Sequence, residues 1–279
     1  LLSTYLLLAI GLKGGLRLRE ASVDELSMPV IATIVLGILT PSVAYLVSRR
    51  FLKLSISDAA AMAAHYGSVS AVTFTAAETF AREAGTLGEE YLAALVALLE
   101  VPGIIVALVI ASRALGGKSM RSAVHEVVTG RSIVLLIGGI AIGLITNGDS
   151  AAVVEPLFVG LFPGVLVLFL LDLGVLAGER LERIRAAGWR LVVFAIGIPI
   201  LFGVIGALAG TWVGLSIGGV TVLATMVASA SYIAAPAAVR VGLPEADQGL
   251  ALGAALGVTF PFNLVIGIPL YAELAGRLA

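Results

Sequence analysis

Apolar runs of about membrane length recur along the whole chain, separated by charged or glycine- and proline-rich breaks. A helix needs about 20 residues to cross the hydrocarbon layer. Backbone in lipid must satisfy its own hydrogen bonds, which leaves helices and closed barrels, and no strand-like alternation is visible here. The sequence therefore predicts an all-α integral membrane protein, with helical segments near 1–12, 28–48, 57–81, 89–113, 132–147, 157–177, 188–211, 216–239 and 248–274.

Composition agrees with a membrane protein and excludes several function classes. The chain is 59% hydrophobic and 13% charged, whereas soluble domains carry about 25% charged residues. A net charge of −1 gives no reason to expect a nucleic-acid partner, and the absence of cysteine rules out a disulfide framework. The two histidines lack metal-ligand spacing, and neither a P-loop nor a nucleophile elbow is present. We therefore expect neither an enzyme nor an organic cofactor.

Two of the apolar segments are interrupted by similar polar stretches, at 67–73 and at 229–236. Ser68 and Ser229 are 161 positions apart, and so are Ser70 and Ser231. Unwound backbone survives at membrane depth only where it is buried or lines a polar cavity. A matched pair of such interruptions is the best sequence pointer to the binding site of a secondary transporter.

The similarity between the halves extends beyond these interruptions. Residues 10–15 resemble 173–178, and 101–103 resemble 260–262, at nearly the same offset. The second half holds five segments and the first half four, so one helix is expected before Leu1. An odd number of helices per repeat places the halves in opposite orientations, which predicts an inverted repeat.

The repeat interpretation divides the chain into 1–131, which lacks its first helix and ends in a hydrophilic linker at 113–131, and 132–279. Most Lys and Arg lie on one side of the expected membrane, at 49–53, 113–131, 180–190 and Arg240. The positive-inside rule makes that side cytoplasmic and places the C-terminus outside. We expect a multi-pass protein of the bacterial plasma (inner) membrane.

The interrupted segments could bind an anion. Half-helices that begin at the interruptions would direct N–H groups and positive dipole ends toward it. Hydroxyl groups would add donors without fixed charge, from Ser68, Ser70, Thr73, Ser229 and Ser231. The alternative is small-residue packing between helices. Two copies in matched positions favour the binding site.

Oxygen-bearing residues near two prolines could hold a cation. Glu100 precedes Pro102, and the matching Pro261 lies between Thr259 and Asn263. Carboxylate, hydroxyl and amide oxygens suit a hard cation such as sodium. A structural hydrogen bond is an equally good interpretation of Glu100.

Two further ionisable residues have plainer explanations. Asp172 is more readily explained by an ion pair or a helix contact, with Lys13 as the candidate partner, than by a substrate role. His65 could sense pH, but a hydrogen-bonded packing role is favoured.

Four stretches together resemble a known family: 65–73, 170–174, 228–236 and 256–263. The chain resembles the sodium-dependent bicarbonate transporters of cyanobacteria and their wider bacterial relatives, over essentially its whole length. The resemblance implies ten helices in two inverted five-helix repeats, with two broken helices crossing at mid-membrane. It also implies a homotrimer, an elevator-type movement, and inward transport of bicarbonate with sodium as the coupling ion.

The resemblance also implies a spatial division and a site. A gate or scaffold domain would comprise 1–27 and 132–187, and a core or transport domain 28–112 and 188–279. The family's site lies where its broken helices meet. Carried over to this chain, the substrate-binding residues are Gly67, Ser68, Val69, Ser70, Thr73, Ser229, Ser231 and Ile233.

The chain departs from the cyanobacterial pattern at Tyr232, where the family has Asp, and at Ala234 and Ala235, where it has Ser and Gly. The 113–131 linker is shorter, and no residues support the family's PII-like regulatory partner. The coupling ion, stoichiometry and substrate thus stay open. The alternatives are a sodium- or proton-coupled transporter of another small anion, such as an organic carboxylate or amino acid, and a passive anion channel.

Overall fold

The computed structural model describes residues 1–19, 21–115, 124–125 and 128–279, and no strand occurs among them. The all-α prediction is confirmed. Part of the predicted linker, 116–123 and 126–127, lies outside the described residues. The α-helices are α1 Leu2–Leu18, α2 Val23–Arg50, α3 Ile56–Tyr66, α4 Ala71–Glu83, α5 Leu92–Leu115, α7 Arg131–Ile145, α8 Gly148–Glu155, α9 Phe162–Ala187, α10 Trp189–Trp212, α11 Ile217–Ala228, α12 Ala234–Gly242, α13 Gln248–Ala254, α14 Phe260–Phe262 and α15 Ile268–Leu278. Three π-helical turns join them, η1 Pro156–Gly160, η2 Ala255–Thr259 and η3 Asn263–Gly267.

Five helical stretches are long and apolar enough to cross a membrane: Val23–Arg50, Leu92–Arg113, Ala152–Glu179, Trp189–Trp212 and Gln248–Leu278. Two shorter apolar helices, α7 and α11, accompany them. The interrupted segments do not form single long helices, because each is divided into two half-helices, α3 with α4 and α11 with α12. The described residues thus form a multi-pass helical membrane protein.

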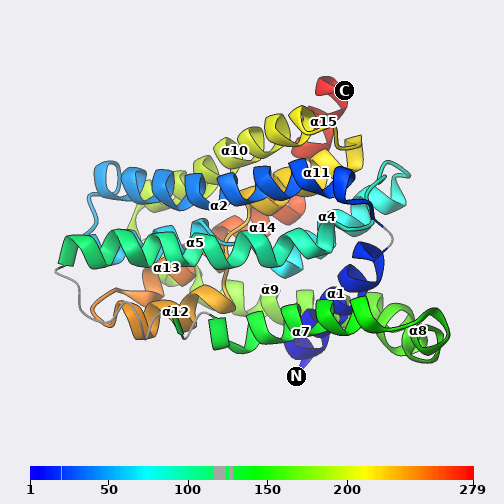
Figure 1. Ribbon diagram of the computed structural model, residues 1–279. Helices are drawn as coiled ribbons and strands as arrows, with labels where there is room; N and C mark the ends of the chain where they lie inside the picture. The colour runs from blue at the N-terminus through cyan, green and yellow to red at the C-terminus, as the bar shows by residue number, and fades with distance from the viewer. Residues whose placement is uncertain (20, 116–123, 126–127) are drawn as a thin grey trace.

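The first helix is longer than the sequence predicted. It continues past its glycines to Leu18 because these glycines pack against α7 (Figure 1). A Cβ at Gly11 would collide with the Leu136 carbonyl, and one at Gly15 with the Ile140 carbonyl. Small residues four apart let two membrane helices approach to backbone contact. The glycines therefore serve close packing and do not end the helix.

Helices from both halves of the chain intermingle in the rest of the molecule. α2, α3 and α5 pack on one another, as do α10, α11 and α15, and α11 also contacts α4. In Figure 1, α1, α7 and α8 lie on one flank of this group, with α2 and α10 on the opposite flank. The interruptions at 67–70 and 229–232 are thereby buried inside this group of helices.

Matching contacts anchor the first half-helix of each pair. Ser55 caps α3 and Ser216 caps α11, and these serines are 161 positions apart. Each helix start is also held by a loop from the other half. The Asp247 amide donates to Asp58 Oδ1 at 2.7 Å, and the Ser216 amide donates to Glu89 Oε1 at 2.7 Å. The serine caps are therefore equivalent in the two halves, whereas the two loop contacts use different positions and reverse the roles of donor and acceptor.

Candidate functional site

The two interruptions lie directly against each other. The first separates Tyr66 from Ala71, and the second separates Ala228 from Ala234. The Ser70 amide donates to Ser229 Oγ at 2.8 Å. The Ser231 amide donates to the His65 carbonyl, also at 2.8 Å. The sequence prediction that these stretches interrupt helices is therefore matched by the structure, which also brings them together.

We call the place where the two interruptions lie against each other the crossing. His65, near the end of α3, stabilises it. Its Nδ1 lies 2.7 Å from the Ser231 carbonyl oxygen. Because a carbonyl can only accept, Nδ1 carries the proton of this hydrogen bond. Its Nε2 is buried and has no partner among the described residues. His65 is therefore a hydrogen-bonded packing residue, the role that the sequence favoured, with one nitrogen still available.

Most hydroxyl groups of the crossing are engaged with one another. Ser70 Oγ donates to Tyr232 Oη at 2.9 Å and accepts from the amide and hydroxyl of Thr73 at 3.1 and 3.0 Å. Ser229 Oγ donates to the Met226 carbonyl at 2.7 Å. A hydroxyl has one proton to donate. The protons of Ser70, Thr73 and Ser229 are therefore committed within the protein.

Two hydroxyl groups keep their protons. Ser231 Oγ accepts from the Ala235 amide at 3.2 Å and donates to no acceptor in the part of the chain that the structure describes. Ser68 Oγ is buried and has no hydrogen-bond partner among the described residues. Of the hydroxyls expected to meet an anion, these two can still donate to one.

The backbone of the first interruption is closely packed. A Cβ at Gly67 would collide with Pro41, and a Cβ at Gly103 would collide with the Gly67 carbonyl. Val69 is also buried. α5 thus lies against the interruption at backbone distance, which only glycines permit.

The crossing meets α1 along a narrow seam. Ala71, Val72 and Thr75 of α4, together with Ile233, face Leu7 and Ile10 across a space with no room for water. A small cavity of about 170 Å³ adjoins it, lined by Ile233, Ala234 and Ala237 and by the starts of α1 and α7. Of the substrate residues expected from the sequence, Ile233 lines both spaces.

Several residues of this seam were not predicted as site residues, among them Ala71, Val72 and Ala234. Their side chains are small or apolar and form no motif. Ala71 begins α4 and Ala234 begins α12, at positions where helix geometry leaves amides without an intrahelical acceptor. Their position after a polar interruption is the signal that could have identified them. Two electropositive helix starts therefore meet the seam.

The predicted cation ligands Thr259 and Asn263 each brace a neighbouring helix. Pro199 lacks an amide proton, so the carbonyl of Ala195 loses its helical partner. Thr259 Oγ1 donates to that carbonyl at 2.6 Å and lies 2.7 Å from Tyr66 Oη. Asn263 Nδ2 donates to the Ala228 carbonyl at 3.0 Å. These residues tie both half-helix pairs to the last membrane segment.

The third predicted cation ligand, Glu100, differs from Thr259 and Asn263 in its hydrogen bonding. It is buried, and its Oε2 has no partner among the described residues. It lies three residues before Gly103 and so shares the face of α5 that covers the first interruption. No described hydrogen bond joins Glu100 to Thr259 or Asn263, so their joint cation site remains a prediction.

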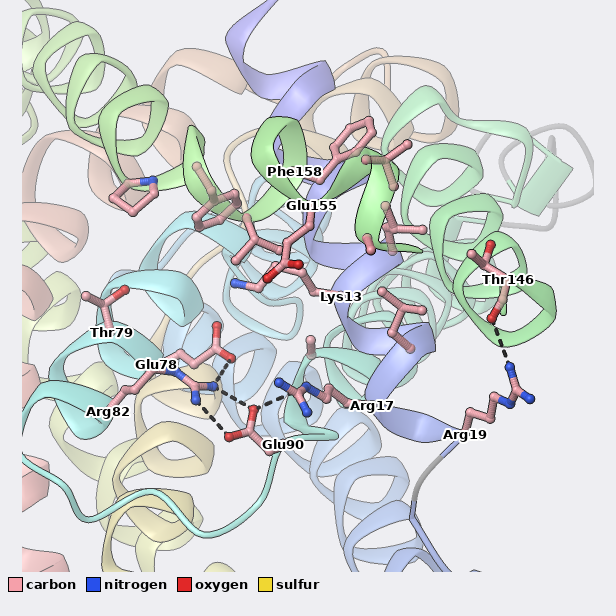
Figure 2. A pocket seen from close by; sticks show the side chains of 18 of the residues that line it. Lys13, Arg17, Arg19, Glu78, Thr79, Arg82, Glu90, Thr146, Glu155 and Phe158 are labelled. Atoms are coloured by element: carbon pink, nitrogen blue, oxygen red, sulfur yellow. Dashed lines mark hydrogen bonds and ion pairs between the residues drawn. The ribbon is translucent and has the colours of Figure 1, made fainter. Parts of the chain in front are cut away.

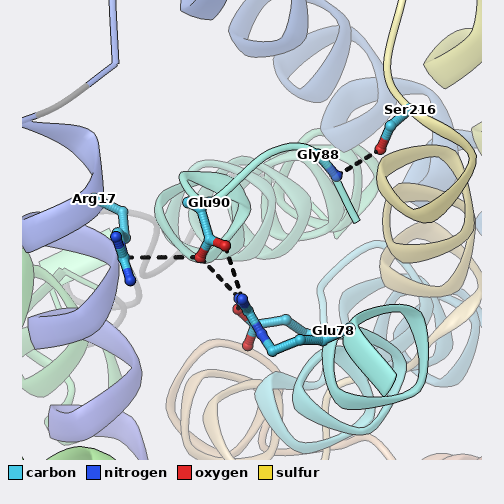
Figure 3. Close-up of polar contacts among 6 residues, drawn as sticks. Arg17, Glu78, Gly88, Glu90 and Ser216 are labelled. Carbon is cyan, nitrogen blue, oxygen red and sulfur yellow. Dashed lines mark hydrogen bonds and ion pairs between the residues drawn. The ribbon is translucent and has the colours of Figure 1, made fainter. Parts of the chain in front are cut away.

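A charged cavity of about 780 Å³ opens between the ends of α1 and α4 (Figure 2). Arg82 donates to both carboxylate oxygens of Glu90, at 2.7 and 2.8 Å, and to Glu78 at 3.3 Å. Arg17 lies 3.7 Å from Glu90 (Figure 3). These contacts, led by the Arg82 hydrogen bond, hold the pKa of Glu90 below its usual value. Glu78 and Arg82, four residues apart in α4, thus form an ion pair on one face of the helix.

Lys13 and Asp172, expected as partners, form no ion pair among the described residues. Asp172 is exposed on α9. The Lys13 ammonium instead lies over the Phe162 ring, 4.4 Å from its centroid, at the wall of the charged cavity. The physical reason is distance: Phe162 is the first residue of α9, and Asp172 lies ten residues, about 15 Å of helix rise, further along the same helix.

Comparison with known proteins identifies the class to which this fold and crossing belong. The sequence profile of the Na+-dependent bicarbonate transporter superfamily matches residues 1–276. The chain belongs to this superfamily, which confirms the resemblance seen in the sequence. A search of curated proteins found no match. Membership supports a role in transport and a membrane environment, with an anion and sodium as the ions concerned at the level of the superfamily.

Proposed function

We propose that the chain is a secondary active transporter that imports bicarbonate by sodium symport. The observation that carries this proposal is the meeting of two half-helix starts, at Ala71 and Ala234, on one seam beside α1. Unpaired amides and helix dipoles stabilise an oxyanion without a fixed positive charge. A small anion bound in this way can also leave, which a transporter requires.

Sodium is the second substrate in this proposal. An uncompensated charge at low dielectric is expensive, so anion and cation bind better together than alone. The unpartnered Glu100 carboxylate supports a cation near the first interruption, and oxygens of Thr259 and Asn263 are the further candidate ligands. Each sodium moving down about 100 mV supplies about 2.3 kcal/mol, in addition to its concentration term.

The architecture that we propose explains how such a site could change sides. Residues 1–131 and 132–279 form inverted repeats; 1–27 and 132–187 form a gate, and the remaining helices a moving core. The matched helix caps Ser55 and Ser216 support the repeat. Elevator movement, a homotrimer, and an inner-membrane location with the C-terminus outside belong to the same proposal.

Uptake of radiolabelled bicarbonate into proteoliposomes tests the function. We expect saturable uptake that requires an inward sodium gradient and is lost when choline replaces sodium. Protein-free liposomes are the control. Absence of uptake under both conditions would contradict the proposal.

Two other results would assign a different function. Flux that neither saturates nor depends on sodium would identify a passive channel. Sodium-driven uptake of an organic carboxylate or amino acid in place of bicarbonate would identify another anion as the substrate.

A further inference from the structure

The charged cavity, the closed space and the small cavity follow one another along α1. Lys13 and Leu16 line the charged cavity, Leu7 and Ile10 line the closed space, and Thr4 and Leu7 line the small cavity. Lining residues on the opposing helix α4 follow the same order. Glu78 and Thr79 face the charged cavity, and Val72 and Thr75 face the closed space. One seam therefore leads from the charged cavity to the start of α4.

The charged cavity is accessible from outside the protein. The side chains of Arg17 and Arg82 that line it are 50% and 46% exposed. Beyond Ile10 the seam is closed to water by apolar side chains from both walls. In this structure the charged cavity therefore leads toward the half-helix starts, but the closed part of the seam separates it from them.

Four cationic residues line the charged cavity, and three are engaged with protein oxygens. Arg82 is paired with Glu78 and Glu90, Arg17 with Glu90, and Arg19 donates to the Thr146 carbonyl at 2.9 Å. Figure 2 shows these side chains around the opening.

Lys13 differs from the other three cations. Its ammonium lies over the Phe162 ring and has no hydrogen bond or ion pair to a carboxylate among the described residues. An ammonium carries three donors, so Lys13 can bind an anion that enters. Lys13 is also only three residues, about 4.5 Å of helix rise, from Ile10, which lines the closed space.

We propose that the charged cavity is the entrance to the transport path and that Lys13 binds the arriving small oxyanion before the seam opens. The aromatic ring holds the ammonium at the wall without neutralising it. Apart from Lys13, the cavity is lined by three arginines and by four glutamates, Glu78, Glu83, Glu90 and Glu155, so it has no net positive charge of its own and the attraction for an anion is local to the Lys13 ammonium. The role of the cavity as an entrance rests on the proposed function, whereas the binding of an anion at Lys13 does not.

Transport kinetics provide the first test. Lys13→Gln should raise KM for the anion about two- to fivefold, the size expected of one partly exposed charge contact, with an unchanged maximal rate. The increase should shrink at high ionic strength, because salt screens exposed charges. Lys13→Arg should restore most of the affinity.

Arg19→Gln is the matched control, because it removes the same charge from the same cavity. Its guanidinium is already bonded to the Thr146 carbonyl, so KM should stay near that of the parent protein. An unchanged KM in Lys13→Gln would overturn the proposal. An equal increase in both variants would also overturn it, because it would assign the effect to the overall potential of the cavity.

A binding measurement separates this inference from the proposed function. The chain contains no cysteine, so Thr79→Cys introduces a single thiol on the wall facing Lys13. A membrane-impermeant thiol reagent should label it from one face, and bicarbonate, acetate or nitrate should slow the labelling. Adding Lys13→Gln should raise the anion concentration needed for half-maximal protection about two- to fivefold. Labelling that no anion slows, or protection that Lys13→Gln leaves unchanged, would overturn the entrance site.

This labelling result does not depend on transport. If bicarbonate uptake fails while acetate or nitrate still protects residue 79 through Lys13, the entrance site stands and the proposed substrate is wrong.

Discussion

The two interruptions carry similar sequences but are stabilised by different chemistry. The first is backed by backbone contact, since α5 approaches the Gly67 carbonyl through Gly103, and Ser70 caps the helix that follows. The second is backed by a side chain, since Asn263 bonds the Ala228 carbonyl. α12 begins at Ala234 after Ile233, which cannot cap it, and the Ser231 hydroxyl instead accepts from the Ala235 amide. Sequence repetition therefore specifies where the helices break, whereas local packing decides how each break is held.

The comparison makes the first interruption the more sensitive to added volume. Gly103→Ala places a methyl group against the Gly67 carbonyl, a backbone atom that cannot rotate away. Overpacking of this kind costs about 1–3 kcal/mol and occasionally more, so we expect the largest fall in thermal stability of the purified protein. Gly174→Ala is the control, because a Cβ there meets nothing within 4 Å. Equal melting temperatures for the two variants would contradict the close packing.

The stability of the second interruption should depend on the side-chain amide of Asn263. Asn263→Ala leaves the Ala228 carbonyl buried without its partner, and an unsatisfied buried group costs about 1–3 kcal/mol. We expect a clear fall in the unfolding midpoint of the purified protein. Ser42→Ala, which removes a hydroxyl bonded within α2 alone, should change the midpoint far less. An unaltered midpoint in Asn263→Ala would show that other contacts hold this interruption.

The hydroxyl network should contribute less. Ser70→Ala removes the cap of α4 and a partner of Tyr232, and loss of a helix cap typically costs about 1 kcal/mol. Ser68→Ala removes a hydroxyl that has no described partner and should leave stability unchanged. Denaturant unfolding of both variants measures the difference. A larger loss in Ser68→Ala than in Ser70→Ala would reverse our assignment of the network.

Much of the fold could be predicted because apolar length and polar interruptions leave a direct trace in sequence. The helix breaks after Tyr66 and Ala228 follow from Gly and Ser residues in otherwise apolar segments. The length of α1 could not be predicted, because its glycines read as a helix end until α7 supplies the partner for close packing. Glycine has both uses, and only the tertiary contact distinguishes them.

The candidate site could be predicted only in part from the sequence, for a related reason. Serines are the obvious candidates in the sequence because they are polar, but the hydroxyl protons of Ser70 and Ser229 are donated within the crossing. The residues that line the seam include Ala71 and Ala234, which stand at the starts of α4 and α12. The backbone amide that such a position leaves without a helical acceptor is common to every residue type except proline. Likewise, the availability of Lys13 depends on Phe162, which lies far away in sequence.

The claim that helix-start amides bind the anion is tested most directly by Ala71→Pro. Residue 71 is the first of α4 and follows Ser70 in extended backbone, a place where the backbone tolerates proline, which replaces the amide proton with a ring carbon. The matched control is Ile217→Pro, the same change at the first residue of α11.

The measurement is the apparent affinity for bicarbonate in sodium-driven uptake. A hydrogen bond to a charged group contributes about 1.5–3 kcal/mol, so we expect about tenfold or greater weakening in Ala71→Pro. Ile217→Pro should keep the parent affinity. Uptake by Ala71→Pro with unchanged affinity would contradict the account, because the anion would then bind without the start of α4.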